Sequence, residues 1–326
     1  MTDVVTTGRA VGGGPFLGEG AALLAAFLWA AATLMFGRLG QRLSPLVLNI
    51  VKGAFAIAMM VITLLLQTHL STDAVGLPDL PTDAIVYLAI SGALGIGLGD
   101  TAYFSAINTL GARRALLLET LAPPMAAVLA WAFLREQLSL SAVAGIALTL
   151  IGIAWVISER VPGTTAQKTG AGIKIALLAT FCQASGAVLS RAALAETAVS
   201  PLWSGLTRLS AGLLLMSVLA FFRIEPAQDT KLKRLRWKSA IDSLRSPRLL
   251  GAVAIAAFFG TYLGIWLQQV ALKHTAAGIA QALLATSPLF VLPMAAVLGE
   301  RISWRAVGGA ALALMGVWLL IFGTQY

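Results

Sequence analysis

Two stretches of this chain repeat each other and decide its fold: PPMAAVLAWAFLREQLSLSAVAGIALTLIGIAWVI (residues 123–157) and SPLFVLPMAAVLGERISWRAVGGAALALMGVWLLI (residues 287–321). At one constant offset, a proline, a glutamate and two glycines recur at the same places. The matched pairs are Pro124 with Pro288, Glu136 with Glu300, Gly145 with Gly309 and Gly152 with Gly316. Such an internal repeat indicates a fold built from two copies of one unit.

The repeat extends towards the N-terminus of each half. SPLVLNIVKG begins at Ser44 and SPLWSGLTRL begins at Ser200, and each carries a cation eight residues after its serine, at Lys52 and Arg208. A polar segment near the centre of the chain separates the two copies. We therefore predict a disordered segment 1–17, a first repeat 18–158, a linker 159–171, a second repeat 172–322 with a basic loop 223–248, and a tail 323–326.

The composition is that of a protein whose main solvent is lipid. The chain is 58% hydrophobic and 11% charged, with mean hydropathy +0.86, whereas a soluble domain carries roughly 25% charged residues. A helix crosses a bilayer with roughly 20 apolar residues, and the apolar runs lack the alternation of barrel strands. They predict ten spans, at residues 20–37, 44–66, 84–107, 112–134, 140–157, 172–190, 201–222, 249–272, 278–298 and 304–322.

Five spans in each half is an odd number, so the second half must enter the membrane from the opposite side to the first. We predict an all-α membrane protein whose ten transmembrane helices form two inverted five-helix repeats. This architecture is typical of secondary transporters, which bind their substrates near the midplane between the repeats. Because residues 1–17 lack an apolar core, the first span is expected to be an uncleaved anchor.

With these features the chain resembles the drug/metabolite transporter superfamily of the EamA type, whose members have ten helices in two EamA repeats. The resemblance covers nearly all residues from 18 to 322, and it rests on the first span (AAFLWAAATLMFGRL), the cations of spans two and seven, and the Pro-to-Glu segments that lead into G-x6-G spans. Two features depart from the family pattern. Lys52 stands where an arginine is usual, and the loop 223–248 is long and basic.

The resemblance implies a secondary active transporter of the cell inner (plasma) membrane, an exporter that moves a small polar or amphipathic metabolite such as an amino acid by alternating access. It does not select the substrate, because relatives export amino acids and other metabolites or move nucleotide sugars. Two alternatives stay open: a multidrug exporter with a neutral cavity, and a membrane sensor or scaffold that transports nothing. The oligomeric state is also left open.

The clearest ionisable residues inside predicted spans are Lys52, Asp100, Glu119 and Arg208. Charges are costly in a membrane, so each of them is a candidate for substrate binding or coupling. Tyr103 lies three residues after Asp100 and shares its helix face. Protons are a plausible coupling ion, since burial disfavours a charged carboxylate. In the alternative interpretation, the two carboxylates only neutralise Lys52 or Arg113, or lie at helix ends beside lipid headgroups.

Polar and aromatic side chains form a second set of candidates. Trp29 and Thr33 are four residues apart, and Tyr262, Trp266 and Gln269 share one face of span eight. Two more amides complete the set of possible substrate contacts, Asn49 and Gln281. Such groups suit a cavity wall, but aromatic residues also pack between helices or anchor at the membrane interface.

Prolines and glycines inside spans point to bends and close packing. Pro123, Pro124 and Pro288 are expected to interrupt spans four and nine, where they either act as hinges or only pack. The glycines of span three (Gly92, Gly95 and Gly99) and of span five (Gly145 and Gly152) are interpreted as sites of close helix approach.

Several function classes lack their usual groups in this sequence. No phosphate-binding loop, zinc-protease motif or serine-hydrolase motif occurs, and His69, His274 and the single Cys182 lie far apart. We therefore expect no enzyme activity, no cofactor and no bound metal. The net charge of +9 comes from short basic loops, which suit anionic lipid rather than nucleic acid. The expected partners are the lipid bilayer, a small-molecule substrate and the coupling protons.

The basic residues also bear on orientation. Most of the 23 Lys and Arg follow odd-numbered spans, and the opposite side holds Arg9, Arg135, Arg191 and Lys273. The positive-inside rule then puts both termini outside the cytoplasm, whereas the family resemblance suggests that both are inside. We follow the charges.

Overall fold

The computed structural model describes residues 16–39, 45–70, 81–110, 112–158, 169–195, 197–222, 246–297 and 303–322. Every regular element within these residues is a helix, as predicted. The expected disordered segment, except for its last two residues, most of the linker, the basic loop up to residue 245 and the short tail lie outside the described residues.

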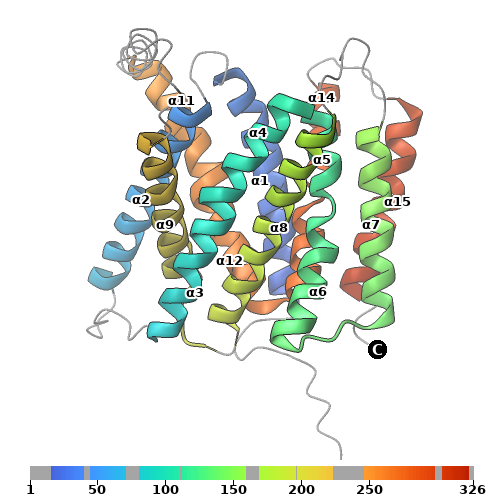
Figure 1. The fold of residues 1–326 in the computed structure, drawn as a ribbon, viewed down its shortest axis with the longest axis horizontal. Coiled ribbons are helices and arrows are strands. Elements are labelled where there is room, and N and C mark those ends of the chain that lie inside the picture. Colours follow the sequence, from blue (N-terminus) through green and yellow to red (C-terminus); the bar gives the residue numbers. More distant parts are fainter. Residues whose placement is uncertain are drawn as a thin grey trace, which may run out of the picture.

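The first half contributes five spans, whose arrangement can be followed in Figure 1. Spans one, two and five are single helices, while span three contains a π-helical turn and span four is broken in two. The elements are α1 (Leu17–Leu39), α2 (Pro45–Leu70), α3 (Thr82–Gly92), η1 (Ala93–Gly99), α4 (Asp100–Leu110), α5 (Ala112–Glu119), α6 (Ala122–Leu134) and α7 (Leu140–Ser158).

The second half follows the same plan. Span eight carries the π-helical turn and span nine is the broken one. Its elements are α8 (Thr169–Leu194), α9 (Pro201–Phe222), α11 (Pro247–Ala257), η2 (Phe258–Leu263), α12 (Gly264–His274), α13 (Ala277–Leu284), α14 (Ser287–Val297) and α15 (Trp304–Phe322).

These elements confirm the ten-helix prediction. Within the described residues, eight segments are long and apolar enough to cross a membrane, and two shorter apolar helices, Ala122–Leu134 and Leu140–Val156, complete the set. The predicted spans agree with the observed ones to within about one helical turn. The matching irregularities of the two halves were not predicted, and they are independent evidence for the repeat.

The prolines act differently from the expected kinks. Pro123 and Pro124 lie in the first turn of α6, and Pro288 is the second residue of α14. In a first turn the missing proline N–H needs no helical partner. These prolines therefore begin new helices after a break and do not bend continuous ones. The proline inside a helix is Pro293, in α14.

The two halves are inverted, so the start of the first helix and the end of the last helix lie at the same face of the bundle. Figure 1 shows that α1 begins at the end of the bundle where α15 finishes, and the rings of Phe16 and Phe322 are 5.6 Å apart. We call this end the terminus face. The end of α6, the end of α8 and the loop between α12 and α13 lie at the same face.

Glycines hold the antiparallel helices α7 and α15 in close contact. A Cβ atom on Gly309 would come within 2.9 Å of the Gly152 carbonyl oxygen, and one on Gly145 would come within 3.1 Å of the Gly316 carbonyl oxygen. Each repeat thus supplies the same two glycines, and because the helices are antiparallel each glycine faces the non-equivalent glycine of the other repeat. The interpretation of Gly145 and Gly152 as sites of close approach agrees with this geometry.

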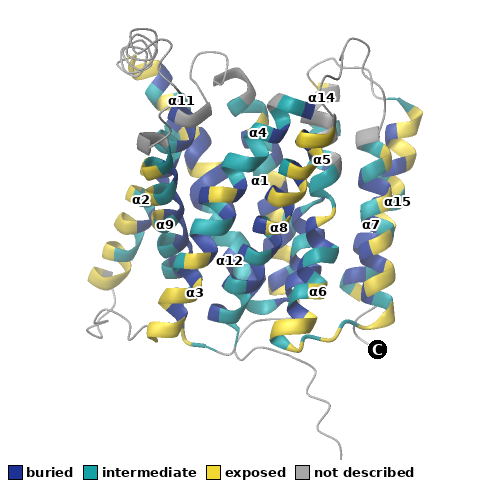
Figure 2. Cartoon of the chain, in the orientation of Figure 1, coloured by how far each residue is buried: buried dark blue, intermediate teal, exposed yellow. Residues whose placement is uncertain are grey.

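The outside of the bundle is apolar, as lipid contact requires. Figure 2 shows exposed residues on the outer sides of peripheral helices such as α2, α7 and α15. They include Trp131, Phe133 and Trp318, which are 62%, 75% and 62% exposed. Large apolar side chains at such exposure fit a hydrocarbon solvent.

The α7–α15 contact predicts different effects for two neighbouring glycines. Gly309→Ala should destabilise the protein by about 1–3 kcal/mol, the usual cost of overpacking, because the new methyl group would meet the Gly152 carbonyl and Val156. Gly308→Ala is the matched control, since nothing lies within 4 Å of a Cβ at Gly308. Thermal unfolding in detergent measures both. Equal midpoints for the two variants would contradict the packing.

The shared face of the termini makes the orientation testable. If the basic loops are cytoplasmic, a cysteine introduced by Ala240→Cys in a Cys182→Ser background should react with a membrane-impermeant maleimide only after cells are permeabilised. Labelling of intact cells at this position would show that the termini are cytoplasmic instead.

Candidate functional site

A small cavity lies between the two repeats. Its volume is about 60 Å³. The first repeat supplies wall residues from α2, η1 and α4, and the second supplies wall residues from α9, η2 and α12. Four of these residues are polar, namely Asn49, Lys52, Asp100 and Thr261, and six are not: Gly53, Ile96, Leu209, Leu213, Met216 and Ile265.

The structure brings together three of the four ionisable candidates. Asp100 is the first residue of α4, directly after the π-helical turn, and its carboxylate interacts electrostatically with Lys52 and Arg208. Neither cation is within salt-bridge distance of it, because the described residues contain one ion pair within 4.0 Å and that pair is elsewhere. The Lys52 ammonium also lies 5.2 Å from the centre of the Phe36 ring, in cation–π range.

Arg208 is the most buried of these charges, at 2% exposure. Its Nη1 donates a 3.3 Å hydrogen bond to Gln268 Oε1, while its buried Nε has no acceptor. A Cβ atom on Gly95 would be 3.4 Å from both Arg208 Nη2 and Gln183 Oε1. The guanidinium therefore lies among η1, α8, α9 and α12, and its Nε–H remains without a hydrogen-bond acceptor.

A glycine makes this placement possible. A Cβ atom on Gly92 would collide with the backbone of Arg208, so α3 and α9 touch through their main chains. Gly212 allows the same approach one turn further along α9, where a Cβ would meet Ile96. This close contact carries the arginine side chain into the space between the repeats.

The fourth ionisable candidate belongs to a separate group. Glu119 is the last residue of α5, at the break in span four, and its carboxyl group interacts with the Tyr103 hydroxyl of α4. Beside it, the Thr180 hydroxyl of α8 reaches the Leu118 carbonyl at 3.3 Å. Asp100 and Tyr103 share a helix, so α4 links this second carboxyl site to the cavity.

The two candidates of span one are bonded to backbone. Trp29 Nε1 donates a 2.8 Å hydrogen bond to the carbonyl of Gly260, inside the π-helical turn of span eight. The Trp29 ring lies where a side chain on Gly264 would be. Thr33 is exposed and donates to the Trp29 carbonyl at 2.7 Å. Within the described contacts, neither residue belongs to the cavity wall.

The stripe predicted on span eight packs against neighbouring helices. The Tyr262 hydroxyl shares a 2.8 Å hydrogen bond with Thr63 of α2, and its ring is 6.2 Å from that of Trp266. Gln269 accepts a 2.8 Å bond from Ser204 of α9, and its buried Nε2 has no acceptor. Gln281 is half-buried on α13. None of these candidates lines the cavity.

Three residues near the cavity and Arg208 were not among the sequence candidates. Gln268 is adjacent to the predicted Gln269, but sequence alone did not favour it. Gln183 would have emerged from a longer repeat alignment, because IALLATFCQ in span six matches AALLAAFLW in span one and places Gln183 opposite Trp29. Thr261 has no comparable pattern, since its direction depends on the π-helical turn.

Comparison with known proteins identifies the family. A model of the EamA-like transporter family matches residues 16–158 and 170–322. No curated protein sequence matches the chain. One similar solved structure is described as the crystal structure of a protein, without a function. It matches 94% of this chain and 98% of its own chain, with a TM-score of 0.71 and 18% sequence identity. At this identity the likeness establishes the fold alone. Because the family model covers both halves, this multi-pass membrane protein belongs to the EamA-like transporter family.

Proposed function

We propose that this chain is a secondary active transporter that exports a small anionic or zwitterionic metabolite, such as an amino acid, across the inner (plasma) membrane. The substrate binds between the repeats, beside Lys52, Asp100 and Arg208, and alternating access carries it across. The observation that carries this proposal is the buried charge cluster. Its two cations face one carboxylate.

The charge balance of the cluster favours an anionic ligand group. With all three groups ionised, one positive charge is left over in a region where charge is poorly solvated. A carboxylate or phosphate would offset it. Arg208 is the better placed of the two cations, because its buried Nε–H has no acceptor and its planar fork matches such an anion. Lys52 is a point charge that already faces Asp100 and Phe36.

The size of the cavity supports a moving site. A ligand pocket usually measures about 300–1,000 Å³, so the 60 Å³ cavity must enlarge before a metabolite can enter. The helices around it have suitable irregularities, since η1 and η2 both contribute to its wall. In this proposal the helix breaks at Pro123, Pro124 and Pro288 act as hinges.

A neutral cavity for hydrophobic drugs is the competing possibility. It would follow if Asp100 and the protein environment fully compensate both cations, so that the substrate brings no charge. The aromatic residues Trp29, Tyr262 and Trp266 would then matter more than the cations. The two possibilities differ in how charge-neutral variants respond to a carboxylate-bearing ligand.

Neutralising Arg208 should selectively weaken the binding of carboxylates. A thermal-shift screen of the purified protein against amino acids, drugs and nucleotide sugars first identifies ligands. For a carboxylate-bearing ligand, Arg208→Gln and Lys52→Gln should each lose about 1.5–3 kcal/mol of binding free energy, the scale of a hydrogen bond to a charged group. The decarboxylated amine of the same ligand should lose little.

Lys174→Gln is the matched control for this experiment, because Lys174 is an exposed cation on α8 away from the cavity. It should bind both ligands as the parent does. Unchanged affinity for the carboxylate in both cavity variants would defeat the anionic proposal and favour the neutral-drug transporter. A protein that no metabolite or drug stabilises, and that moves none, would instead be a sensor or scaffold.

We further propose that transport is coupled to protons through Glu119 or Asp100. Glu119 is the better candidate. Asp100 has two cations in range that favour its ionised form, whereas the described partners of Glu119 are the Tyr103 hydroxyl and the like-charged Asp100. Helix α5 also packs on α7 and α8. α7 carries no charged residue, and near Glu119 α8 presents the Thr180 hydroxyl.

Removing the titratable carboxyl group should uncouple transport from pH. In liposomes, Glu119→Gln should abolish uptake driven by a pH gradient while leaving the folded protein monodisperse, and Asp100→Asn should do so if Asp100 takes part. Tyr103→Phe keeps the carboxyl and is expected to retain coupling with an altered pH profile. If both carboxyl variants respond to the gradient as the parent does, these carboxyls are structural.

A further inference from the structure

The ion pair of the described residues joins the two repeats at the terminus face. Arg191 Nε of α8 donates to Glu136 Oε1 at 2.6 Å. Glu136 follows α6 and belongs to the first repeat, whereas Arg191 lies near the end of α8 in the second. The two side chains are 16% and 12% exposed, so the pair is largely shielded from solvent.

Each partner also binds the ends of two further helices. Arg191 Nη1 donates to the carbonyls of Leu272 and Lys273, at 3.0 and 2.7 Å, which terminate α12. Glu136 Oε2 accepts a 3.1 Å bond from the backbone N–H of Ala277, the first residue of α13. Cations at helix C-termini and anions at helix N-termini are electrostatically favoured. One ion pair thus fastens the ends of α6, α8, α12 and α13 together.

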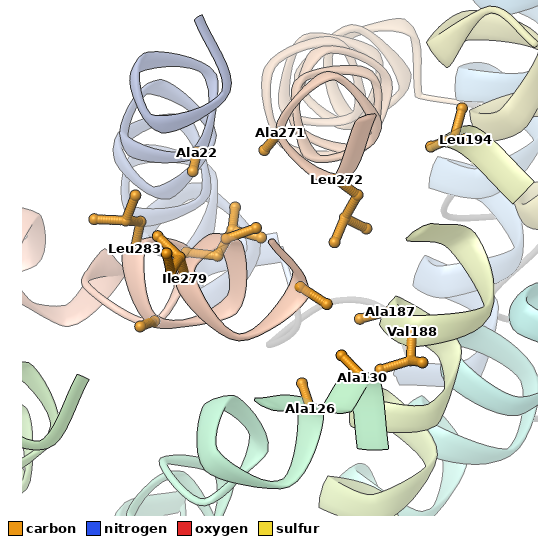
Figure 3. Close-up of a cluster of buried hydrophobic side chains, with 14 of the residues drawn as sticks. Ala22, Ala126, Ala130, Ala187, Val188, Leu194, Ala271, Leu272, Ile279 and Leu283 are labelled. Atoms are coloured by element: carbon orange, nitrogen blue, oxygen red, sulfur yellow. The ribbon is translucent and has the colours of Figure 1, made fainter. Parts of the chain in front are cut away.

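These same helices share one buried cluster of small apolar side chains. Figure 3 shows Ala126 and Ala130 of α6 near Ala187 and Val188 of α8, with residues of α12 and α13 in the same cluster. Fourteen of the 25 buried members of this cluster are alanines, so its helices approach closely without large interlocking side chains. In lipid such contacts hold helices together by van der Waals packing, without a hydrophobic driving force, and interhelical polar contacts add to it. The polar contacts between these helix ends therefore contribute to specifying the closed arrangement.

The network lies between the charge cluster and the terminus face. Gln183, beside Arg208, and Arg191 are eight residues apart on α8, or about 12 Å along the helix. Between them, the Ser91 hydroxyl of α3 donates to the Gly186 carbonyl and pairs with Ser190 at 2.9 Å. Ser91 and Ser190 are fully buried. These buried contacts between α3 and α8 thus lie between Arg208 and the terminus face.

We propose that Glu136 and Arg191 form a latch that holds the terminus face closed, and that this latch must open for the site to reach that face. This inference rests on the proposed transport function for its purpose, but the structural claim stands on the contacts alone. When the latch opens, water at the membrane surface can hydrate Glu136, Arg191 and the helix ends that they bind. Hydration offsets part of the lost contacts, so opening is reversible.

Cysteine accessibility tests the latch without knowledge of the substrate. The reporter is Ser91→Cys in a Cys182→Ser background, and a soluble maleimide is added to the full chain in detergent well below its unfolding temperature. Glu136→Gln and Arg191→Gln should each raise the labelling rate at least about tenfold, since a hydrogen bond to a charged group shifts an equilibrium by that factor or more. Arg191→Lys should give an intermediate rate.

Two controls distinguish a latch at the terminus face from an ion pair that stabilises the whole fold. Lys273→Gln removes a 2.7 Å bond to the Val199 carbonyl that lies wholly within the second repeat, and it should leave labelling of Ser91→Cys within about twofold of the parent. The second control is a reference reporter, Thr149→Cys, which is fully buried at the α7–α15 contact. Its labelling should not respond to the Glu136 or Arg191 variants.

The outcomes are distinct. Parent-like labelling of Ser91→Cys in both latch variants would overturn the proposal, as would a rise at Thr149→Cys equal to that at Ser91→Cys, because the pair would then stabilise the whole fold. If Arg191→Gln does not fold, Glu136→Gln and Arg191→Lys decide, since both keep hydrogen-bonding capacity at their positions. A selective rise at Ser91→Cys in a protein that moves no solute would support the latch and refute the transporter.

Discussion

In a bilayer the backbone has no water to bind, so every carbonyl that leaves a regular helix needs another donor. This requirement explains the side chains found at the irregular points of the bundle. Trp29 donates to Gly260 in the second π-helical turn, and Thr101 donates to Gly97 in the first. The Thr180 hydroxyl donates to the Leu118 carbonyl at one helix break, and the Thr286 hydroxyl donates to the Leu283 carbonyl at the other. Polar side chains therefore add donors at these irregular points, and at the two helix breaks they supplement the backbone N–H groups that the Leu118 and Leu283 carbonyls also accept from.

The repeats share a backbone plan but differ in chemistry. At the offset that aligns their C-terminal parts, Asp100 corresponds to Gly264 and Glu119 to Leu283. Both intramembrane carboxyl groups thus come from the first repeat, while the buried arginine comes from the second. Symmetry places η1 and η2 on the two sides of one cavity, and divergence of the side chains gives that cavity an acidic and a basic contribution from different halves.

Much of this architecture could be predicted from the sequence, because length and hydropathy determine where a helix can cross lipid. The ten spans, the inverted repeat and the glycine contacts follow from such patterns. The cost of burying charge marked Lys52, Asp100, Glu119 and Arg208 as candidates, and the structure brings three of these four together. The π-helical turns could not be predicted, since hydropathy does not report hydrogen-bond register. For that reason Tyr262, Trp266 and Gln269 were expected on a cavity wall, whereas they pack on α2 and α9.

The glycine contact between α7 and α15 has a consequence for how the two halves can change over time. Gly152 packs on Gly309, and Gly145 packs on Gly316, so the shape of each copy at this contact is constrained by the other copy. A larger side chain on either helix would have to be accommodated by a change on its partner. The two copies are therefore free to diverge around the cavity, as Asp100 and Gly264 have done. At the α7–α15 contact, however, the substitutions that one copy can accept depend on the residues of the other copy.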